Sequence, residues 1–522
     1  MVSTTNAQVS EARHHKIVSN IFSNWATSLV GMVVGFLLAP VMVHRLGDAG
    51  YGVWTFSLQI SSLLIVMDLG VRSSVGRFLT YHHTRGEKEQ INAVLSVAFA
   101  ALGGLGALCV AASLFISIFL PHIVKVQPAM LHDARWTVLL VSWTVAVSLP
   151  GSIFAGAIAS LSRYDILNFR YVLHGLIRAL LTWLVLVHGG GIVAISIVWL
   201  LTAVVAIFCD VLIATKLYRG FELRFDLRKY KSVARSLLSF SFYVFLLSIS
   251  VRLVLWSDNI VIAVILGPAA VTFYAIGGNL IDVARGTLSS MTTVYVPLAT
   301  SYQAKGDSLA LRQLFVRGSR VGLLILLPVV IAFLIVGKEF IRLWMGPQYV
   351  MVAGTVLILL AIPVLFAPLQ MTSNQLLYGV NRHQAYAYIA VCEAAINLGL
   401  SIILARTIGV VGVAWGTMIP AVIIEGLIVP SYTASVLKQP VLPLYWRAWI
   451  GPVALSLPYA TWLFVSHRIG WPITWPGFVL TIATGLLIYA LTTWFLTLSE
   501  GERQTVVVRF KQVIPVPARS VV

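Results

Sequence analysis

The sequence predicts an all-α polytopic membrane protein. Of its 522 residues 59% are hydrophobic and only 10% are charged, whereas soluble domains average about 25% charged residues. The apolar runs are long enough for helices of roughly 20 residues, which cross a bilayer, and they lack the roughly ten-residue alternation of outer-membrane barrels. No stretch between them reaches the roughly 50 residues of a soluble domain.

The apolar runs predict about fourteen spans, an even number that places both termini on the same side. They lie near residues 17–43, 52–71, 91–119, 136–159, 171–188, 191–214, 237–265, 271–297, 319–337, 349–373, 385–405, 409–435, 447–466 and 476–498. The first run is longer than the core of a signal peptide, so we expect it to be retained.

The distribution of positive charge predicts the orientation. The termini and the loops on their side hold 27 of the 36 Lys and Arg, and the opposite side holds seven. Cytoplasmic loops carry such an excess, so we expect a multi-pass protein of the cytoplasmic (inner) membrane with both termini cytoplasmic. The net charge of +18 then mainly reflects the orientation of the protein in the membrane, and we expect no nucleic-acid partner.

The chain contains an internal repeat whose landmarks recur at nearly one offset. They are Leu46-Gly47 with Leu266-Gly267, Arg85-Gly86-Glu87 with Lys305-Gly306-Asp307, Arg163 with Arg382, and Gly190 with Gly409. Each copy holds six predicted spans, an even number, so both copies insert the same way. This is the parallel-repeat arrangement, which predicts two six-helix lobes around a central cavity.

The repeat also predicts the domain boundaries. Residues 1–214 form the N-terminal lobe, and 237–435 form the C-terminal lobe. A basic cytoplasmic linker, 215–236, joins them. Residues 436–522 lie outside the repeat and provide two additional helices and a cytoplasmic tail.

The two spans that meet at the turn Leu266-Gly267-Pro268 contain the most informative polar residues. Arg252 and Asp258 precede the turn, and Asp282 and Arg285 follow it. At about 1.5 Å per residue, Arg252 and Asp282 lie roughly 21 Å and Arg285 roughly 26 Å from the turn, and we expect all three near the midplane. Ionisable groups at that depth are costly, so they are a functional-site hypothesis. Asn279 continues the polar face of Asp282 and Arg285.

Other intramembrane polar residues allow two interpretations each. Asn24 belongs to a stripe of amide, hydroxyl and glycine residues that either packs helices closely or lines the cavity. Asp68 and Arg72, four residues apart, form either a structural salt bridge or an inner gate. Asp258 either binds a coupling cation or proton or caps a water-filled vestibule, and Glu393 and Glu425 either carry protons or sodium or face the lumen and are hydrogen-bonded across helices.

The sequence shows no sign of catalysis. It contains no nucleotide-binding glycine loop, no metal-ligand cluster and no nucleophile paired with a base. Its three cysteines lie singly inside predicted spans. We therefore predict no catalytic residues, no metal site and no cofactor beyond a coupling proton or sodium ion.

Three segments resemble the polysaccharide biosynthesis or oligosaccharide flippase family. They are 40–54 (PVMVHRLGDAGYGVW), 258–274 (DNIVIAVILGPAAVTFY) and 343–346 (LWMG). The family belongs to the superfamily of multidrug, oligosaccharidyl-lipid and polysaccharide exporters. The resemblance implies a flippase that moves an undecaprenyl-diphosphate-linked oligosaccharide between leaflets by alternating access, for lipopolysaccharide or exopolysaccharide assembly. The resemblance also implies two kinds of partner. One is membrane lipids, and the other is a polysaccharide polymerase or the export machinery.

Flippases of this kind use cationic side chains in the cavity, and the candidates here are Arg252 and Arg285. Guanidinium groups bind phosphate oxygens bidentately and stay protonated, so we expect both to contact the diphosphate. Asp282 is close enough in depth to neutralise either one in the empty cavity. The alternative is a permanent Arg–Asp bridge that locks the two spans together.

Rival functions follow from the same residues. A multidrug extruder would favour a cavity dominated by carboxylates, which the midplane arginines disfavour. A lipid II flippase would have a basic residue in the first span, where Asn24-Trp25 stands instead. A membrane glycosyltransferase or polymerase would need a larger extramembrane region, and a scaffold would not need charges at the midplane.

Overall fold

The structure is a computed structural model that describes residues 2–65, 75–218, 257–497 and 503, with gaps at 77, 80, 83–84, 162 and 293. Side chains are described from Val30 onward, except at positions 290 and 383. The described residues are helical and contain no strand, which confirms the all-α prediction. By contacts the chain divides into two compact units. The first unit comprises Met1–Ala275 and Ala390–Thr417, and the second comprises Ile276–Ile389 and Met418–Val522.

The helices follow the predicted spans closely. Those from the first half are α1 (Val2–Leu64), α3 (Lys88–Ile123), α4 (Leu131–Ser160), α5 (Tyr164–Val187) and α6 (Ile192–Leu217). Then come α8 (Pro268–Thr292), α9 (Tyr295–Ala304), α10 (Ser308–Trp344), α11 (Val352–Val364), α12 (Ala367–Gly379), α13 (His383–Ile408) and α14 (Val410–Ile423). The last are the π-helix η4 (Ile424–Ile428), α15 (Val429–Val436), α16 (Val441–Tyr445), the π-helix η5 (Trp446–Ile450), α17 (Gly451–Leu455), α18 (Leu457–Ile469), α19 (Trp475–Thr492) and the π-helix η7 (Thr493–Thr497).

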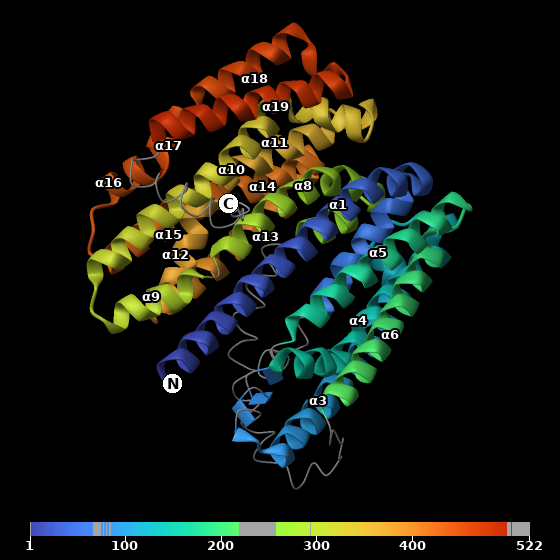
Figure 1. Cartoon of the computed structure of the whole chain (residues 1–522). Helices are drawn as coiled ribbons and strands as arrows, with labels where there is room; N and C mark the ends of the chain where they lie inside the picture. The colour runs from blue at the N-terminus through green and yellow to red at the C-terminus, as the bar shows by residue number, and fades with distance from the viewer. Residues whose placement is uncertain are drawn as a thin grey trace, which may run out of the picture. The chain divides into compact units, whose positions relative to one another are not determined.

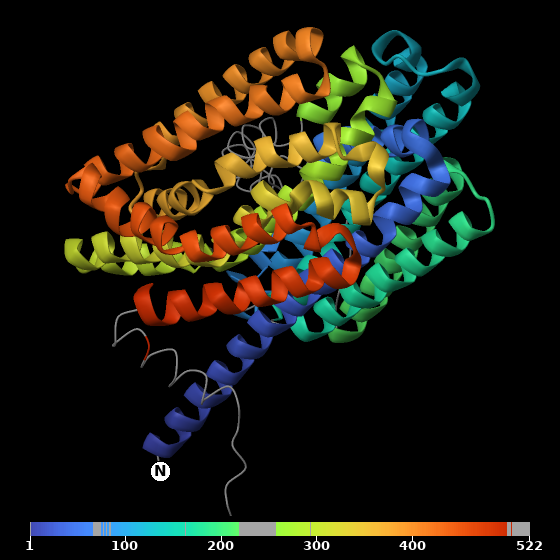
Figure 2. The same cartoon turned by 90° about the horizontal axis from the view of Figure 1, so that it is seen from above.

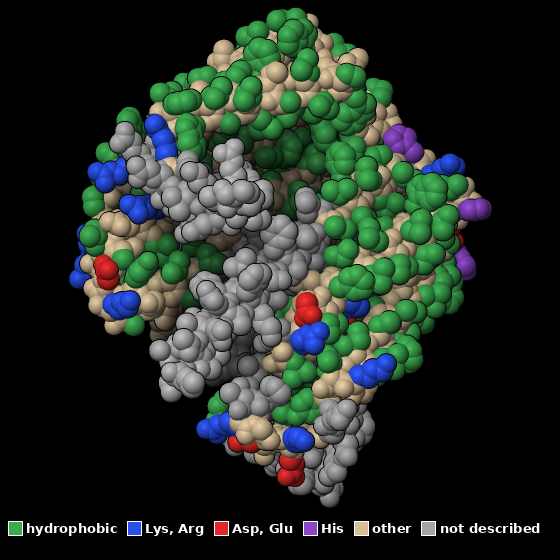
Figure 3. Space-filling model, viewed as in Figure 1, with side chains coloured by type: hydrophobic (Ala, Val, Ile, Leu, Met, Phe, Trp, Pro, Cys, Tyr) green, Lys and Arg blue, Asp and Glu red, His purple; other side chains and the backbone are tan. Residues whose placement is uncertain are grey.

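Among the described residues, ten helices are long and apolar enough to cross a membrane, or eleven if α11 and α12, bent by 45°, form one span. The number fourteen stays a prediction. The helix α1 extends over the predicted span 17–43 and most of 52–71 and is broken between them at Gly47, whose backbone is not helical, and most of span 237–265 lies outside the described residues. Exposed apolar side chains gather over the upper and right-hand parts of the face shown in Figure 3, as expected for a surface in contact with lipid.

Sharp turns between helices recur with a constant offset. Six glycines with left-handed backbone angles form three pairs with the same separation along the chain: Gly47 (φ 68°) with Gly267 (φ 96°), Gly86 (φ 70°) with Gly306 (φ 68°), and Gly189 (φ 81°) with Gly409 (φ 66°). Only glycine adopts this region without steric cost. The backbone therefore repeats at the offset of the sequence, except that the partner of Gly409 is Gly189 and not Gly190.

In the first unit, α4 packs against α1, α3 and α6, and α1 also packs against α5 (Figure 1). Small residues permit these close contacts. A Cβ on Gly106 of α3 would lie 2.6 Å from the carbonyl oxygen of Ala146 in α4. Leu102, Ile153 and Ile158 fill the core between α3 and α4.

In the second unit, the two helices outside the predicted repeat pack on α10. Figure 2 shows α18 and α19 side by side. Pro328 inside α10 has no N–H for the carbonyl of Leu324, four residues earlier. The Tyr489 hydroxyl donates to that carbonyl at 2.7 Å, and the Tyr459 hydroxyl donates to the carbonyl of Pro328 at 3.0 Å. Tyrosines of the last two helices thus satisfy backbone groups at the proline of α10.

Candidate functional site

Arg285 of α8 and Glu425 of η4 form a bidentate ion pair inside the second unit. Arg285 Nη1 donates to Glu425 Oε1 at 3.1 Å, and Nη2 donates to Oε2 at 3.2 Å. The side chains are 19% and 6% exposed. Two parallel charge-assisted hydrogen bonds are the strongest geometry available to such a pair.

The carboxylate of this pair lies on a π-helical turn. In a π-turn the hydrogen bonds run from i to i+5, and such turns are often found at functional sites. The Tyr445 hydroxyl donates to the Gly426 carbonyl in this turn. Phe366 also packs here, since a Cβ on Gly426 would lie 3.1 Å from its ring. The π-turn is therefore held by side chains from α16 and from the turn between α11 and α12, both in the second unit.

Asp282 and Asn279 lie on α8 near Arg285, and both are exposed. Asp282 is three residues before Arg285 and close enough to interact with it electrostatically. From the sequence we expected Asp282 to neutralise either Arg252 or Arg285, with Glu425 as a separate candidate for ion coupling. The structure adds Glu425 as a direct partner of Arg285.

Asp258 is buried in the first unit, where three hydroxyl groups donate to its carboxylate. They are those of Tyr274 in α8, Thr417 in α14 at 2.6 Å, and Ser401 in α13 at 3.3 Å. The side chain is 5% exposed. A carboxylate removed from water needs such donors, because its desolvation is otherwise too costly.

Glu393, another predicted coupling acid, belongs to the same helix face as one of these donors. Glu393, Asn397 and Ser401 lie at four-residue intervals along α13, and all three are buried. Asn397 Nδ2 donates to the Thr417 hydroxyl at 3.0 Å, which links this face to Asp258. Two of the three predicted coupling acids, Asp258 and Glu393, therefore lie in the first unit, while Glu425 lies in the second.

A basic stripe on α5 was missed by the sequence analysis. Arg170, His174 and Arg178 lie at four-residue intervals along this helix. Arg170 Nη2 pairs with Asp210 Oδ2 of α6 at 2.8 Å, and both side chains are largely buried. The guanidinium carbon of Arg178 lies 4.1 Å from the ring centroid of Trp199 in α6.

Both arginines are among the 27 Lys and Arg that the sequence assigns to the cytoplasmic side. However, α5 already begins at Tyr164, which places Arg178 about 21 Å along the helix. The four-residue spacing of Arg170, His174 and Arg178 was the available signal, because it puts all three on one helix face.

Several predicted site residues cannot be placed. Arg252, Asp68 and Arg72 lie outside the described residues, as does the side chain of Asn24 within α1. Their proposed roles as diphosphate contact, inner gate and cavity lining stay predictions.

Residues 17–303 match the family described as polysaccharide biosynthesis protein. The chain belongs to this family. It is also 24% identical over 504 residues to the protein named "Uncharacterized membrane protein EpsK" of Bacillus subtilis (strain 168), covering 95% of this chain and 98% of that protein. The family predicted from the three sequence segments is confirmed.

Solved structures with the same fold are transporters. The structure described as "Lipid II flippase MurJ, inward closed conformation" matches with a TM-score of 0.67 and 15% identity, covering 91% of this chain and 98% of that one. An inward-facing MATE family transporter of the MOP superfamily matches with a TM-score of 0.66 and 13% identity, covering 79% and 98%. At identities this low, the likeness shows only that this polysaccharide biosynthesis protein shares the fold of the two transporters.

Proposed function

We propose that this polysaccharide biosynthesis protein is a flippase of the cytoplasmic membrane, with both termini cytoplasmic. Its substrate is an undecaprenyl-diphosphate-linked oligosaccharide, which it moves to the outer leaflet by alternating access and without enzymatic chemistry. The observation that carries the proposal is the ion pair between Arg285 of α8 and Glu425, which lies in Val410–Val436, a segment long and apolar enough to cross a membrane. The family assignment and the flippase-like fold support it.

The ion pair suits the binding of a diphosphate. The guanidinium group of Arg285 presents two N–H groups to the two oxygens of Glu425, and phosphate oxygens match the same fork. In the empty protein Glu425 neutralises the charge of Arg285, so no bare cation is buried. In the loaded protein the diphosphate replaces the carboxylate, and Asp282 and Asn279 lie nearby on α8. Arg252 is the second proposed diphosphate contact.

Replacement of Glu425 by substrate leaves a carboxylate that must bind a cation or a proton. Glu425 is therefore a candidate for coupling in its own right. The hydroxyl-bonded Asp258 and the neighbouring Glu393 in the first unit are the other two candidates for coupling to protons or sodium.

The proposal is tested with purified protein in proteoliposomes that contain a fluorescent undecaprenyl-diphosphate oligosaccharide. A membrane-impermeant glycan-binding reagent reports how much of the lipid has moved between leaflets. Wild type should equilibrate the leaflets, and Arg285→Ala should not. Arg163→Ala is a matched control, because Arg163 forms an exposed ion pair with Asp165 at 3.1 Å.

A cation-coupled multidrug extruder is the alternative supported by a specific observation, the buried acids Asp258 and Glu393 in the first unit. Extruders of cationic drugs need carboxylates in their binding region. If wild type leaves the oligosaccharide lipid in place but exports cationic dyes, the flippase proposal is wrong. Movement of lipid II in place of the oligosaccharide lipid would retain a flippase but replace the substrate.

A further inference from the structure

The helix α12 carries a polar face where a helix in contact with lipid would be apolar. Together with α11 it is long and apolar enough to form one span, bent by 45°. Among the described residues, no large apolar side chain of α11 or α12 is exposed. The half-buried side chains of α12 instead gather on one face, which we name the α12 face: Gln370, Met371, Asn374, Gln375 and Tyr378. Four of these five are polar, so the face borders water rather than lipid.

The α12 face begins beside the ion pair of the proposed diphosphate site. In the second unit, α12 packs against α15 and against η4, the π-turn that contains Glu425 (Figure 1). Phe366, directly before α12, packs on Gly426 of this turn. Gln370 lies one helical turn beyond Phe366 and Asn374 lies two turns beyond it, about 6 and 12 Å along the helix. The amides of the α12 face therefore extend away from the carboxylate that pairs with the arginine.

Asn374 lacks the partner that a structural amide would have. Amides inside a membrane normally hydrogen-bond across helices. Gln370 does so, since its Nε2 donates to the Tyr386 hydroxyl of α13 at 2.8 Å. The side-chain oxygen of Asn374 is buried and has no hydrogen-bond partner among the described residues, which costs free energy. The residue itself is half-exposed, so rotation about χ2 turns its amide toward a ligand that can donate.

The opposite face of α12 differs in this respect. The hydroxyl groups of Thr372 and Ser373 there also lack partners among the described residues. Both residues are fully buried, so no ligand reaches them, and a hydroxyl group can turn to a carbonyl of its own helix. Within α12, only Asn374 combines an unpaired side-chain atom with partial exposure.

The chemistry of the α12 face fits a sugar. A sugar hydroxyl both donates and accepts, and each side-chain amide offers one acceptor and two donors. Gln370, Asn374 and Gln375 supply three amides, and the ring of Tyr378 adds an apolar surface against which the C–H groups of a sugar ring can pack. The helix contains no charged residue. The α12 face therefore suits a neutral polar ligand better than a phosphate or a cationic drug.

We propose that Gln370 and Asn374 bind the glycan of the transported lipid and so select a glycosylated lipid over bare undecaprenyl diphosphate. This inference rests on the proposed flippase function. With the diphosphate at Arg285, Gln370 contacts the sugar joined to it. Asn374, one turn further, contacts the next sugar and accepts from one of its hydroxyl groups. The Gln370 oxygen accepts in the same way, while its nitrogen keeps the bond to Tyr386.

The test measures the binding of two lipids to the purified full-length protein in nanodiscs by native mass spectrometry. One is the lipid-linked oligosaccharide extracted from cells that make the protein, and the other is undecaprenyl diphosphate. Wild type should bind the oligosaccharide lipid more tightly. Asn374→Leu should weaken binding of that lipid about fivefold, the contribution of one hydrogen bond, and should leave binding of undecaprenyl diphosphate unchanged. Its unfolding temperature should not fall, since the side chain of Asn374 has no partner to lose.

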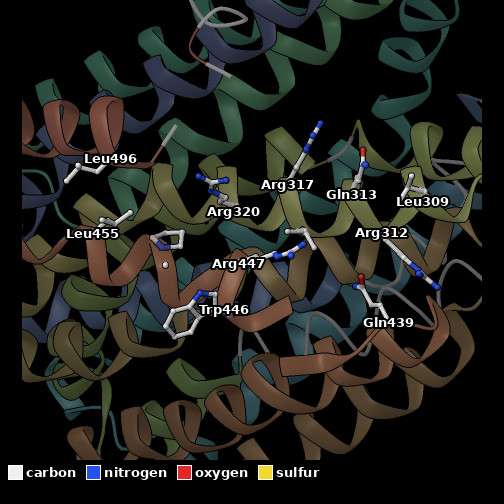
Figure 4. A pocket seen from close by; sticks show the side chains of 13 residues that line it. Leu309, Arg312, Gln313, Arg317, Arg320, Gln439, Trp446, Arg447, Leu455 and Leu496 are labelled. Atoms are coloured by element: carbon white, nitrogen blue, oxygen red, sulfur yellow. The ribbon is translucent and has the colours of Figure 1, made fainter. Parts of the chain in front are cut away.

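Gln439→Leu is the matched control. Gln439 is also a half-buried amide of the second unit, and its side-chain nitrogen has no partner among the described residues. It lines a separate pocket of about 690 Å³, formed by α10 with η5 and α17, to which α12 contributes no described residue (Figure 4). Gln439→Leu should bind both lipids as wild type does. An equal selective loss in this control would overturn the assignment to α12.

Arg285→Ala separates this inference from the proposed function, because it removes a contact to the diphosphate that both lipids share. It should weaken both lipids alike. If wild type binds neither lipid, the proposed function is wrong and the glycan site with it. If Arg285→Ala weakens both lipids and Asn374→Leu weakens neither, the proposed function stands and the glycan site is wrong.

Two further results would overturn the glycan site. One is equal affinity of wild type for the two lipids. The other is a lower unfolding temperature of Asn374→Leu without a selective loss of the oligosaccharide lipid, which would make Asn374 a structural residue. If Asn374→Leu does not fold, Asn374→Ala removes the amide without adding a large apolar side chain and should show the same selective loss.

Discussion

Arg285 and Glu425 lie far apart in the chain and face each other through two hydrogen bonds of 3.1 and 3.2 Å. Each residue is separately noticeable in the sequence as an ionisable group inside an apolar run. Their pairing joins α8 to the π-turn between α14 and α15, so one contact fixes two helices of the second unit.

Removing one partner of this pair should destabilise the protein more than removing both. Arg285→Met alone leaves Glu425 buried without its counter-charge, at a cost of about 3 to 5 kcal/mol, and Glu425→Gln alone removes the bidentate partner of Arg285 and leaves the electrostatic interaction with Asp282. The double variant Arg285→Met/Glu425→Gln should recover most of that loss. Thermal unfolding in detergent, followed by tryptophan fluorescence, measures all three. Additive losses in the double variant would mean that the two groups are not coupled.

Substitutions of Arg285 should show whether transport needs only its positive charge or also its two parallel hydrogen bonds. Arg285→Lys keeps the positive charge but loses the two-pronged fork, so we expect leaflet equilibration to be slower than in wild type and faster than in Arg285→Ala. The proteoliposome assay with the fluorescent oligosaccharide lipid gives the rates. Full activity of Arg285→Lys would show that a point charge suffices and that bidentate binding is not required.

The basic stripe on α5 should contribute to stability through the Arg170–Asp210 pair. Asp210→Asn should lower the free energy of unfolding by about 3 to 5 kcal/mol, because it leaves Arg170 buried without a counter-charge. The matched control is Asp165→Asn, whose partner Arg163 is exposed, and it should have no measurable effect. Similar unfolding temperatures for the two variants would contradict the assignment of Arg170 to the interior.

The hydroxyl groups that donate hydrogen bonds to Asp258 should contribute to the stability of the first unit. Thr417→Val removes the donor at 2.6 Å and should cost about 1 to 3 kcal/mol, since a buried acceptor loses a partner. Thr215→Val is the control, because Thr215 is exposed and bonds only within its own helix among the described contacts. Asp258→Asn should abolish any dependence of transport on an imposed proton or sodium gradient. A gradient response that persists in Asp258→Asn would remove this residue from coupling.

Close backbone packing in the first unit gives a prediction about α1. A Cβ at Gly52 would lie 1.8 Å from the carbonyl oxygen of Pro268, and backbone cannot yield as a side chain does. Gly52→Ala should therefore unfold the first unit or prevent accumulation of the protein. Gly103→Ala in α3 has open space around it and should accumulate normally. Membrane-fraction immunoblots compare the two, and normal levels of Gly52→Ala would contradict the packing.

The fold was predictable because its signals are local. Hydropathy marks each span, and the left-handed glycine turns mark where spans end. Pairing was not predictable, since nothing in either segment shows that Arg285 meets Glu425 rather than only Asp282. The basic stripe on α5 was missed for a different reason. Positive charge was used only to assign orientation, although a cation stacked on Trp199, such as Arg178, can lie within a span.

The three equally spaced glycine pairs imply that the mutational tolerance of the chain has a long-range period. A non-glycine residue at any of the six positions costs about 1 to 2 kcal/mol in backbone strain alone. The strain arises twice, at matching points of two halves with different side chains. In a saturation mutagenesis map, the autocorrelation of the fitness scores should therefore show a peak at the lag that separates Gly47 from Gly267. Such a peak would show the internal repeat of the chain in its tolerance to mutation.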